Sequence, residues 1–393
     1  MNLLIVFTLI GVWELCKLEE VAKITMGQSP NSKNYTKNPN DYILVQGNAD
    51  IKNGKVVPRV WTTQLTKQAE KGDLLLSVRA PVGDIGKTEY DVVIGRGIAG
   101  IKGNEFVFQQ LSKMKDNNYW ARYSTGSTFE SISSNDIRGA IFFIPEKIEQ
   151  ESIGLFLKNI DNFIVLHQRK LDQLKELKKA YLQVMFPKKD ETVPRVRFTD
   201  FEGEWEQCKL GKIGKTQSGI GFPDVEQGGT EGIPFYKVSD MNNPGNEHEM
   251  INANNFVNKE QLKRKKWKPI ETVPAIMFAK VGAAIMLNRK RLVTSSFLID
   301  NNTMAYIFDN SWDTNFGKTL FETINLPRYA QVGALPSYNG LDIESIEVIL
   351  PNKDEQAKIG EHFSNLENLI TLHQNKLEQL NELKKSYLQN MFI

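Results

Sequence analysis

This sequence has few of the residues that build metal centres and disulfide frameworks. It contains two cysteines and four histidines, and their spacing matches no zinc-binding pattern. We therefore expect no metal site, and we expect Cys16 and Cys208 to be the reduced thiols of a cytoplasmic protein. Both cysteines lie in one repeated motif, WELCKL from Trp13 and WEQCKL from Trp205. They are thus predicted to be equivalent positions of a repeat and not partners in one bond.

A long hydrophobic run is also lacking. The apolar stretch NLLIVFTLIGVW occupies residues 2–13, whereas a membrane-spanning helix needs roughly 20 apolar residues. The stretch has no basic region before it and no small-residue cleavage site. We expect a buried N-terminal strand here and no membrane association. A non-native start is the alternative, because the residues before Trp205 are far more polar.

The sequence also has no large excess of either positive or negative charge. The 49 basic residues are balanced by 47 acidic ones, for a net charge of +2. This balance excludes a strongly cationic body, so any nucleic-acid binding must come from local basic patches.

Catalytic motifs are not recognisable. GRGIAG (95–100) fits a dinucleotide-binding pattern, but Gly103 and Asn104 break the helix that such a site requires. GDIGKT (83–88) resembles part of a phosphate-binding loop, but Pro81 stands where its first glycine belongs. The triplet 247–249, Glu-His-Glu, lies in an Asn-rich loop and is expected to be solvated. We predict no catalytic residue and no cofactor bound by this chain.

What the sequence does contain is an internal repeat. Residues 150–186 match residues 356–392 at 22 of 37 positions, with an offset of 206. The two WE-x-CKL motifs match at an offset of 192, and the residues between these anchors diverge. Repeats of this kind indicate a duplicated architecture.

The repeat divides the chain into variable parts and constant helices. We expect a variable domain at 1–149, a helix at 150–187, a linker at 188–204, a second variable domain at 205–351 and a second helix at 352–393. The variable parts contain short β-branched and aromatic runs typical of strands, at 42–46, 73–78, 91–94, 275–279 and 303–308. The predicted fold class is α+β, with two mixed α/β domains separated by two long helices.

Both constant segments carry apolar or bulky residues at alternating steps of four and three, from Ile153 to Met185 and from Ile359 to Met391. This heptad spacing predicts a coiled-coil seam, and each helix is the obvious partner of the other. We expect an antiparallel coiled coil with a pseudo-two-fold axis. The predicted layers pair Ile153 with Tyr387, Ile160 with Leu380, His167 with His373, Leu174 with Leu366, and Tyr181 with Ile359. The central histidines would form a polar layer that fixes the register, or alternatively a pH-sensitive contact.

Polar and basic residues of the variable parts are candidates for DNA contacts. LKRKKWKP (262–269) surrounds Trp267 with basic residues, and NRKR (288–291) follows; a solvated charged surface is the alternative for each. Lysines would contact phosphates, whereas Arg, Asn and Gln would read base edges. The predicted DNA-contacting residues are Gln28, Ser29, Asn31, Gln46, Asn48, Arg79 and Arg96 in the first part, and Ser218, Lys237, Ser239, Asp240, Lys265, Lys266, Lys268, Lys280, Arg289 and Arg291 in the second.

The order of these features resembles the DNA-specificity subunit of type I restriction-modification systems. WE-x-CKL, a variable block and L-x-ELKK-x-YLQ-x-MF, all repeated once, carry the resemblance from Trp13 onward. GQSPNSKNY (27–35) with QGNAD (46–50), and SVRAPVGDIG (77–86) with GRGIAGI (95–101), look like one type of target-recognition domain. SGIGFP (218–223) with FYKVSDMN (235–242), and FAKVGAAI (278–285), look like a second type.

The resemblance implies a non-catalytic protein. Each variable domain would read one half of a split, asymmetric DNA target, and the helices would form the spacer. Two modification (methyltransferase) subunits with S-adenosylmethionine, and two restriction subunits with ATP and magnesium, would assemble on this scaffold. The alternative is a coiled-coil scaffold whose two variable domains bind proteins instead of DNA.

Overall fold

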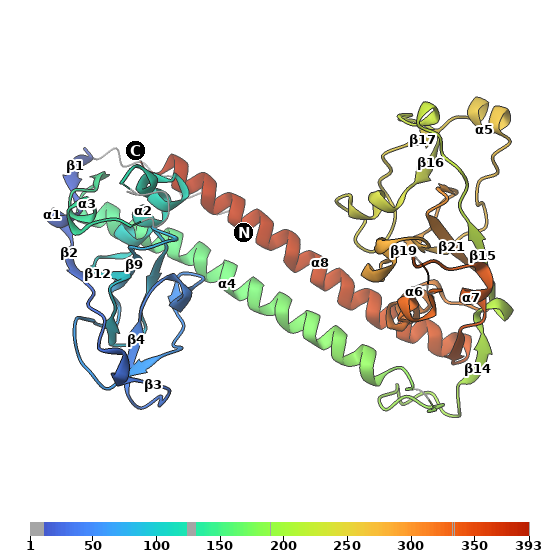
Figure 1. Cartoon of the computed structure of the whole chain (residues 1–393), viewed down its shortest axis with the longest axis horizontal. Helices are drawn as coiled ribbons and strands as arrows, with labels where there is room; N and C mark the ends of the chain where they lie inside the picture. The colour runs from blue at the N-terminus through green and yellow to red at the C-terminus, as the bar shows by residue number, and fades with distance from the viewer. Residues whose placement is uncertain (1–11, 124–130, 189, 332, 334, 393) are drawn as a thin grey trace. The chain divides into compact units, whose positions relative to one another are not determined.

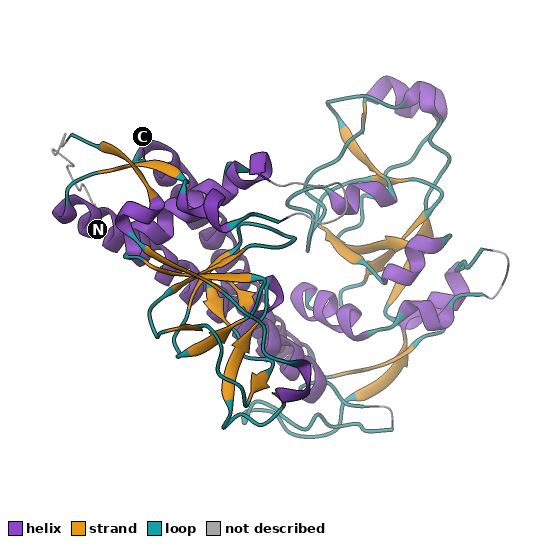
Figure 2. Ribbon diagram, turned by 60° about the vertical axis from the view of Figure 1, so that its left-hand side comes forward, coloured by secondary structure: helices purple, strands orange, loops and turns teal. Residues whose placement is uncertain are grey.

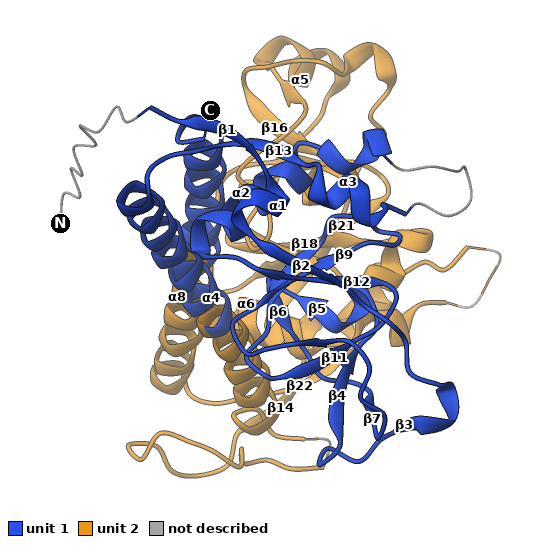
Figure 3. Ribbon diagram, turned by 90° about the vertical axis from the view of Figure 1, so that its left-hand side faces the viewer, with its two compact units in different colours: residues 1–169, 374–393 blue, residues 170–373 orange. Residues whose placement is uncertain are grey.

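The computed structural model describes residues 12–123, 131–188, 190–331, 333 and 335–392, and it divides into two compact units (Figure 1). Unit 1 comprises residues 1–169 and 374–393, and unit 2 comprises residues 170–373 (Figure 3). Both units share the long helices α4 (Lys147–Val184) and α8 (Lys353–Asn390). The predicted N-terminal strand at 2–13 lies outside the described residues, except for its last two positions.

Unit 1 contains two larger sheets and a two-stranded pair (Figure 2). The first sheet has the order β2 (Lys23–Met26), β12 (Ile98–Lys102), β9 (Leu74–Ser77), β10 (Ile85–Lys87), β6 (Lys55–Val56), β5 (Ile51–Lys52). The second has the order β3 (Tyr35–Thr36), β7 (Trp61–Thr62), β4 (Tyr42–Val45), β11 (Val92–Ile94), β8 (Gln68–Ala69). The pair is β1 (Glu14–Lys17) with β13 (Ile141–Ile144), and the short helices are α1 (Leu18–Val21), α2 (Glu105–Asp116) and α3 (Ser134–Arg138).

Unit 2 is built in the same way. Its first sheet has the order β15 (Gly214–Ser218), β21 (Thr303–Phe308), β18 (Ala275–Ala279), β19 (Lys290–Val293). The second has the order β17 (Phe256–Val257), β16 (Ile233–Tyr236), β20 (Leu298–Ile299). The pair is β14 (Glu206–Lys209) with β22 (Glu347–Leu350), and the short helices are α5 (Lys259–Lys265), α6 (Thr314–Thr323) and α7 (Gly340–Glu344).

The two units therefore repeat one strand order although their middle sequences diverge. The antiparallel run β2-β12-β9-β10 corresponds to β15-β21-β18-β19, and the parallel pair β4-β11 corresponds to β16-β20. Cys16 lies opposite Phe142 and Cys208 lies opposite Val348 in the two equivalent strand pairs. Both thiols are free, which confirms that the cysteines are equivalent positions. The five predicted strand runs all form strands.

The joint between each variable domain and its helices is duplicated too. Gly154 of α4 and Gly360 of α8 stand at equivalent positions, and a Cβ on either would lie within 3 Å of the backbone nitrogen of Phe106 or Phe316, at the start of α2 or α6. Only glycine therefore permits this close approach. Gln150 next to Gly154 accepts a hydrogen bond from Asn104, the N-cap of α2, at 2.9 Å. The repeated residues of the helices thus hold the domains in place.

The helix pair shows the predicted seam. The heptad positions of both helices that the structure describes are buried or half-buried, and most polar residues on either side of them are exposed. α4 begins at Lys147, three residues before the predicted start. Pro145 lies just before the helix, where proline is tolerated because no helical N–H is needed there. It ends at Val184, shortly before Pro187, which cannot continue a helix.

Within each unit the two helices run antiparallel. Contacts between them include Phe156 with Tyr387 (rings 4.9 Å apart) and Asp161 with Lys384 (2.7 Å) in unit 1, and Tyr181 with His362 (rings 4.9 Å apart) and Glu367 with Lys178 (2.7 Å) in unit 2. Each pair of unit 1 occupies the positions of a pair in unit 2. Phe156 lies three residues beyond the predicted partner of Tyr387, and His362 lies three residues beyond that of Tyr181. The register as a whole stays a prediction.

Among the described residues, no helix is long and apolar enough to cross a membrane.

Candidate nucleic-acid interface

Three glycines of unit 1 bring distant loops into backbone contact. A Cβ on Gly27, directly after β2, would lie 2.1 Å from the carbonyl oxygen of Gly95, and a Cβ on Gly97 would lie 2.2 Å from that of Gln46. The GRGIAG motif is therefore a tight connection between β11 and β12, as the sequence indicated, and not a nucleotide-binding loop. The backbone N–H of Arg96 donates to Ser29 Oγ at 3.0 Å. One surface therefore combines the turn at 95–97 with the residues that follow β2 and β4. We name this surface loop cluster 1.

Loop cluster 1 contains most of the predicted residues of the first domain. Gln28, Asn31, Arg79 and Arg96 are exposed, and Ser29, Gln46 and Asn48 are half-buried. Arg79 belongs to the same surface because the preceding residue, Val78, donates its N–H to Gly97 at 2.9 Å.

The carboxylate of Asp50 organises loop cluster 1, and sequence reasoning missed it. Asp50 is 3% exposed and accepts the backbone N–H of Gln46 at 2.8 Å and the Nε–H of Arg59 at 2.8 Å. Arg59 is half-exposed beside it and supplies a further guanidinium at this surface. Gln64, also missed, accepts hydrogen bonds from the N–H of Asn31 at 2.9 Å and from Asn34 at 2.7 Å. The signal for Asp50 was its place at the end of QGNAD, a spacing that suits a carboxylate capping its own loop.

Unit 2 repeats this construction with different residues. A Cβ on Gly219, directly after β15, would lie 1.8 Å from the carbonyl oxygen of Asp300, in the loop before β21. Ser218 ends β15 and is exposed. Asp300 also donates its N–H to the carbonyl of Tyr236 at 3.0 Å, which brings the neighbouring Lys237 to the same place. We name this surface loop cluster 2.

Lys237 and Lys280 both adjoin the buried carboxylate of Asp300. Burial raises the pKa of Asp300, and hydrogen bonds from Asn302 and Thr303 and the charge of Lys237 oppose the rise. Lys280 donates its backbone N–H to Asn302 at 2.8 Å, and Asn302 donates to Asp300 at 2.9 Å. Loop cluster 2 therefore contains two lysines, of which Lys237 donates from Nζ to Gln227 at 3.1 Å, where loop cluster 1 contains arginine and amide side chains.

Asp240 does not fit the expected direct contact. It is 0% exposed, and its Oδ2 accepts the backbone N–H of Lys237 at 2.7 Å. Burial raises its pKa, against the opposing effect of hydrogen bonds from Lys237 and Asn254. Asp240 therefore shapes the loop, while the exposed Ser239 beside it remains available to a ligand.

The basic segment at 262–269 lies on the second sheet of unit 2. Lys265 Nζ and Arg264 pair with the buried carboxylate of Glu226 at 3.3 Å and 2.6 Å. The ring of Trp267 packs against Phe235, with ring centres 5.3 Å apart. Trp267 is thus part of a core and not a free stacking surface. Lys266 and Lys268 are exposed.

The structure does not bring Arg289 and Arg291 to loop cluster 2. Arg289 directly precedes β19 and Arg291 lies within it, at the sheet edge opposite to β15. Arg291 donates to the carbonyl oxygens of Asn246 and Lys290, and Arg289 donates to the side chain of Asn242. They line a cavity of about 350 Å³ beside Lys290, whose pKa burial lowers to about 8.

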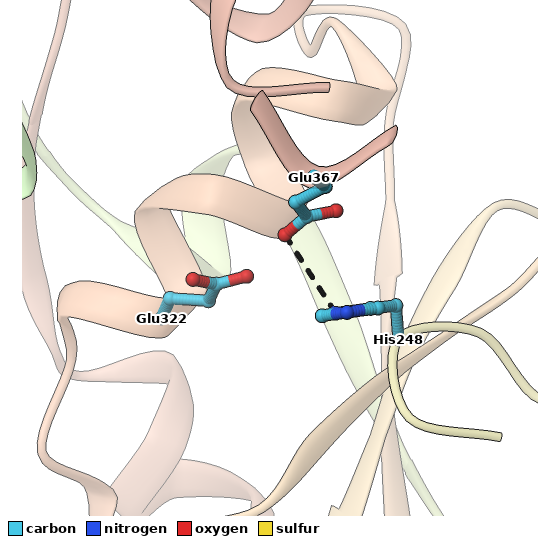
Figure 4. Close-up of side chains that lie close together, drawn as sticks. All are labelled: His248, Glu322 and Glu367. Atoms are coloured by element: carbon cyan, nitrogen blue, oxygen red, sulfur yellow. Dashed lines mark ion pairs between the residues drawn. The ribbon is translucent and has the colours of Figure 1, made fainter. Parts of the chain in front are cut away.

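A partly buried ion cluster lies next to this cavity (Figure 4). His248, Glu322 and Glu367 have side-chain donor atoms within 4.8 Å of one another, a spacing that could hold a metal ion. Lys178 donates to both carboxylates at 2.7 Å, and Lys318 pairs with Glu367. Two ammonium groups thus already balance the two carboxylates. In the triplet 247–249, which was expected to be solvated, Glu247 is exposed, whereas the side chain of His248 is 41% exposed and its Nδ1 lies 3.7 Å from Glu367.

Comparison with known proteins identifies one family. A family model described as the type I restriction modification DNA specificity domain matches residues 11–176 and again residues 202–382. The chain is 34% identical over 181 residues to the putative type I restriction enzyme MjaX specificity subunit of Methanocaldococcus jannaschii, covering 44% of this chain and 42% of that protein. It is 24% identical over 314 residues to the MjaIX specificity subunit of the same organism, covering 74% and 71%. The chain thus spans less than half the length of the first relative.

Two solved structures share the fold. One is the S subunit of a type I restriction-modification system from M. genitalium, with a TM-score of 0.68, 14% identity and 98% of both chains covered. The other is described as revealing complex assembly and conformational transition of the type I R-M system, with a TM-score of 0.52, 14% identity and 97% of both chains covered.

Proposed function

This chain belongs to the family of type I restriction modification DNA specificity domains, and on that premise we propose that it is the DNA-binding specificity subunit of a type I restriction-modification complex. Each unit reads one half of a two-part, asymmetric DNA target. The observation that carries this proposal is the pairing of one repeated frame with two different loop clusters. A shared frame presents both surfaces in the same way, and unlike side chains give unlike half-sites.

Loop clusters 1 and 2 are the proposed reading surfaces. Arginine and amide side chains suit base edges, so Arg96, Arg79 and Gln28 are the proposed readers of the first half-site. The lysines at 237, 280, 266 and 268 suit phosphates, which position a domain on DNA without reading the sequence. Arg289 and Arg291 would reach DNA only at a separate surface, because their guanidinium groups are bonded within unit 2.

The helices are proposed to dock two copies of the same modification subunit. Large apolar residues are exposed at equivalent positions of both helices. These are Phe163 and Leu369 (54% and 44% exposed), Leu166 and Leu372 (60% and 62%), and Leu177 and Leu383 (41% and 43%). Exposed apolar positions that recur together favour protein interfaces. Because they occur twice, they support two equal docking sites.

The chain itself is proposed to be non-catalytic, with S-adenosylmethionine on the modification subunits and ATP and magnesium on two restriction subunits. We propose a cytoplasmic location. Assembly of this kind is the subject of one of the similar structures.

Mapping methylated adenines in the host genome, with and without this gene, tests the proposal. A two-part motif that disappears with the gene is the expected result. Gel-shift titration with the modification subunit present is the second test, and we expect binding that weakens steeply with salt. A single contiguous methylated motif would refute the proposal that each unit reads one half of a two-part target. DNA binding that is missing under every partner condition would favour a scaffold whose domains bind proteins.

A further inference from the structure

The cavity of about 350 Å³ in unit 2 lies beside the edge strand β19, and we name it the β19 cavity. Its wall is formed by side chains of α4, α6, β19 and the residues just before β19, together with His248 and its neighbour Glu247. Five basic side chains line it, against two acidic ones. The balance of these charges indicates what the cavity can bind.

Two of the five basic side chains already have acidic partners. Lys178 of α4 donates to Glu322 and to Glu367 at 2.7 Å each. Lys318 of α6 also pairs with Glu367. Two ammonium groups and two carboxylates thus balance one another, and the remaining charge of the cavity lies at β19.

The other three basic side chains, at β19, are hydrogen-bonded to uncharged groups. Lys290 Nζ donates to the carbonyl oxygen of Ile324 at 2.6 Å, and Arg291 donates to two backbone carbonyl oxygens. Arg289 donates to the side chain of Asn242. Among the described residues, no carboxylate forms a salt bridge with any of these three cations. Their hydrogen bonds therefore hold the side chains in place without neutralising them.

Of the described lining residues, the exposed Glu247 is the one carboxylate left to oppose these three cations, so the wall at β19 has an excess of two positive charges. Burial lowers the pKa of Lys290 to about 8, although the charge of Glu322 opposes this change. Burial and the charge of Arg289 also lower the pKa of Arg291, against the opposing charges of Glu247 and Glu322. An anion that enters the cavity would stabilise the charged forms of these side chains.

A phosphate group matches this wall in charge and in hydrogen bonding. A phosphate monoester carries about −1.5 to −2 charges at neutral pH, which is close to the excess positive charge. Guanidinium groups bind phosphate oxygens through paired hydrogen bonds. We propose that the β19 cavity binds the phosphate group of a small phosphorylated molecule, and that Arg289, Lys290 and Arg291 hold this group.

The location of the cavity favours a small molecule over the DNA backbone. Its volume lies within the range of small-molecule sites, and the apolar side chains of Ile276 and Leu292 line another part of it, where they can contact the uncharged part of a ligand. β19 forms the sheet edge opposite to β15, the strand that ends at loop cluster 2. The inference therefore does not depend on DNA recognition by this chain.

Isothermal titration calorimetry of the full chain with inorganic phosphate, in chloride buffer of constant ionic strength, tests the proposal. We expect saturable binding, which Arg289→Gln and Lys290→Gln should each weaken at least about tenfold, because each removes a charged hydrogen-bond donor. The matched control is Arg195→Gln, which removes the same charge from an exposed arginine that pairs with Glu191. The control should bind phosphate as the parent does, and circular dichroism verifies the folding of each variant.

A second titration separates a small ligand from DNA as the source of the phosphate. It is carried out with the modification subunit and an excess of duplex DNA containing the methylated motif, and we expect an unchanged affinity for phosphate. Displacement of phosphate by the duplex would assign the cavity to the DNA backbone and overturn the proposal. Phosphate that does not bind saturably would overturn it as well. Equal losses of affinity in Arg289→Gln and Arg195→Gln would also refute it, because they would indicate attraction by net charge alone.

Discussion

The partly buried ion cluster of unit 2 offers a sharp test, because unit 1 holds a weaker version of its Lys178–Glu367 pair. Glu367 lies at the position equivalent to Asp161, and Lys178 lies at that equivalent to Lys384. Burial alone would raise the pKa of Glu367, but the Lys318 and Lys178 ammonium groups outweigh burial and lower the pKa to about 2. The side chain of Glu367 is 10% exposed, against 28% for Asp161. We therefore expect Glu367→Gln to cost far more stability than Asp161→Asn.

The pKa of Glu367 gives the size of the stability loss expected for Glu367→Gln. A fall from 4.5 to about 2 corresponds to about 3 kcal/mol at neutral pH, since one unit is worth about 1.4 kcal/mol. Burial and the charge of Glu367 raise the pKa of Glu322, although Lys178 opposes the rise, so this neighbour offsets part of the gain. Glu367→Gln leaves Lys318 without its carboxylate partner, a loss of similar size. For Asp161→Asn we expect about 1 kcal/mol or less, because that pair is more exposed.

The pH dependence has a definite sign. The pKa of Glu367 is lower in the folded protein, so its stabilisation is complete above the unfolded pKa near 4.5 and is lost as the pH falls towards 2. The destabilisation by Glu367→Gln should therefore shrink to about half between pH 7 and pH 3.

Hydrogen exchange read by mass spectrometry separates the units, since α6 reports on unit 2 and α2 on unit 1. We expect faster exchange in α6 for Glu367→Gln and little change in α2. Equal losses in the two variants, or a loss for Glu367→Gln that does not vary with pH, would refute the electrostatic reasoning.

Three further outcomes are expected. Gly97→Ala should lower the free energy of unfolding by about 2 kcal/mol or more, because its Cβ would lie 2.2 Å from the carbonyl oxygen of Gln46. The control Gly47→Ala should be tolerated, because its Cβ meets no described atom within 4 Å. Equal melting temperatures of the two variants would refute this. Arg96→Ala should weaken binding by about 1–3 kcal/mol and relax only the first half-site, measured by gel shift on half-site variants with Arg195→Ala as control. Replacing residues 205–350 by another second-type domain should change one half of the methylated motif, and a change in both halves would show that the units do not read independently.

The sequence predicted the periodic parts of this structure well. The seam from Ile153 to Met185 follows from the heptad spacing alone, because an apolar stripe along a helix must be buried against another element. The strands at 73–78 and 275–279 were also readable, because each is a short apolar run of strand length flanked by glycine or proline. The duplicated ends of the helices fixed the equivalence of the two units before any coordinate was known.

The loop clusters were only partly predictable. Ser29 and Arg96 meet because three glycines let distant backbones touch, and such contacts have no signature in a local pattern. Arg291 has the composition of a DNA contact, yet its N–H groups are bonded to carbonyl oxygens of its own unit. Asp50 was missed because its place at the end of QGNAD indicates a loop cap, but nothing in the sequence shows that its carboxylate is buried and also binds Arg59. Charge is visible in a sequence, but its neutralisation is a property of the folded chain.

The aromatic contact at the end of each long helix has a consequence for chain connectivity. Phe186 meets Trp205 with ring centres 6.2 Å apart, and Phe392 meets Trp13 at 6.3 Å. In unit 2 a peptide segment joins these two rings, whereas in unit 1 the same contact forms between residues from opposite ends of the sequence. A loop could therefore join residue 392 to residue 13, and the chain could be cut between residues 186 and 205. The product would be a circular permutant that retains the ring contacts of both units. Which domain comes first along the backbone is, in this architecture, a property of the gene and not of the packing.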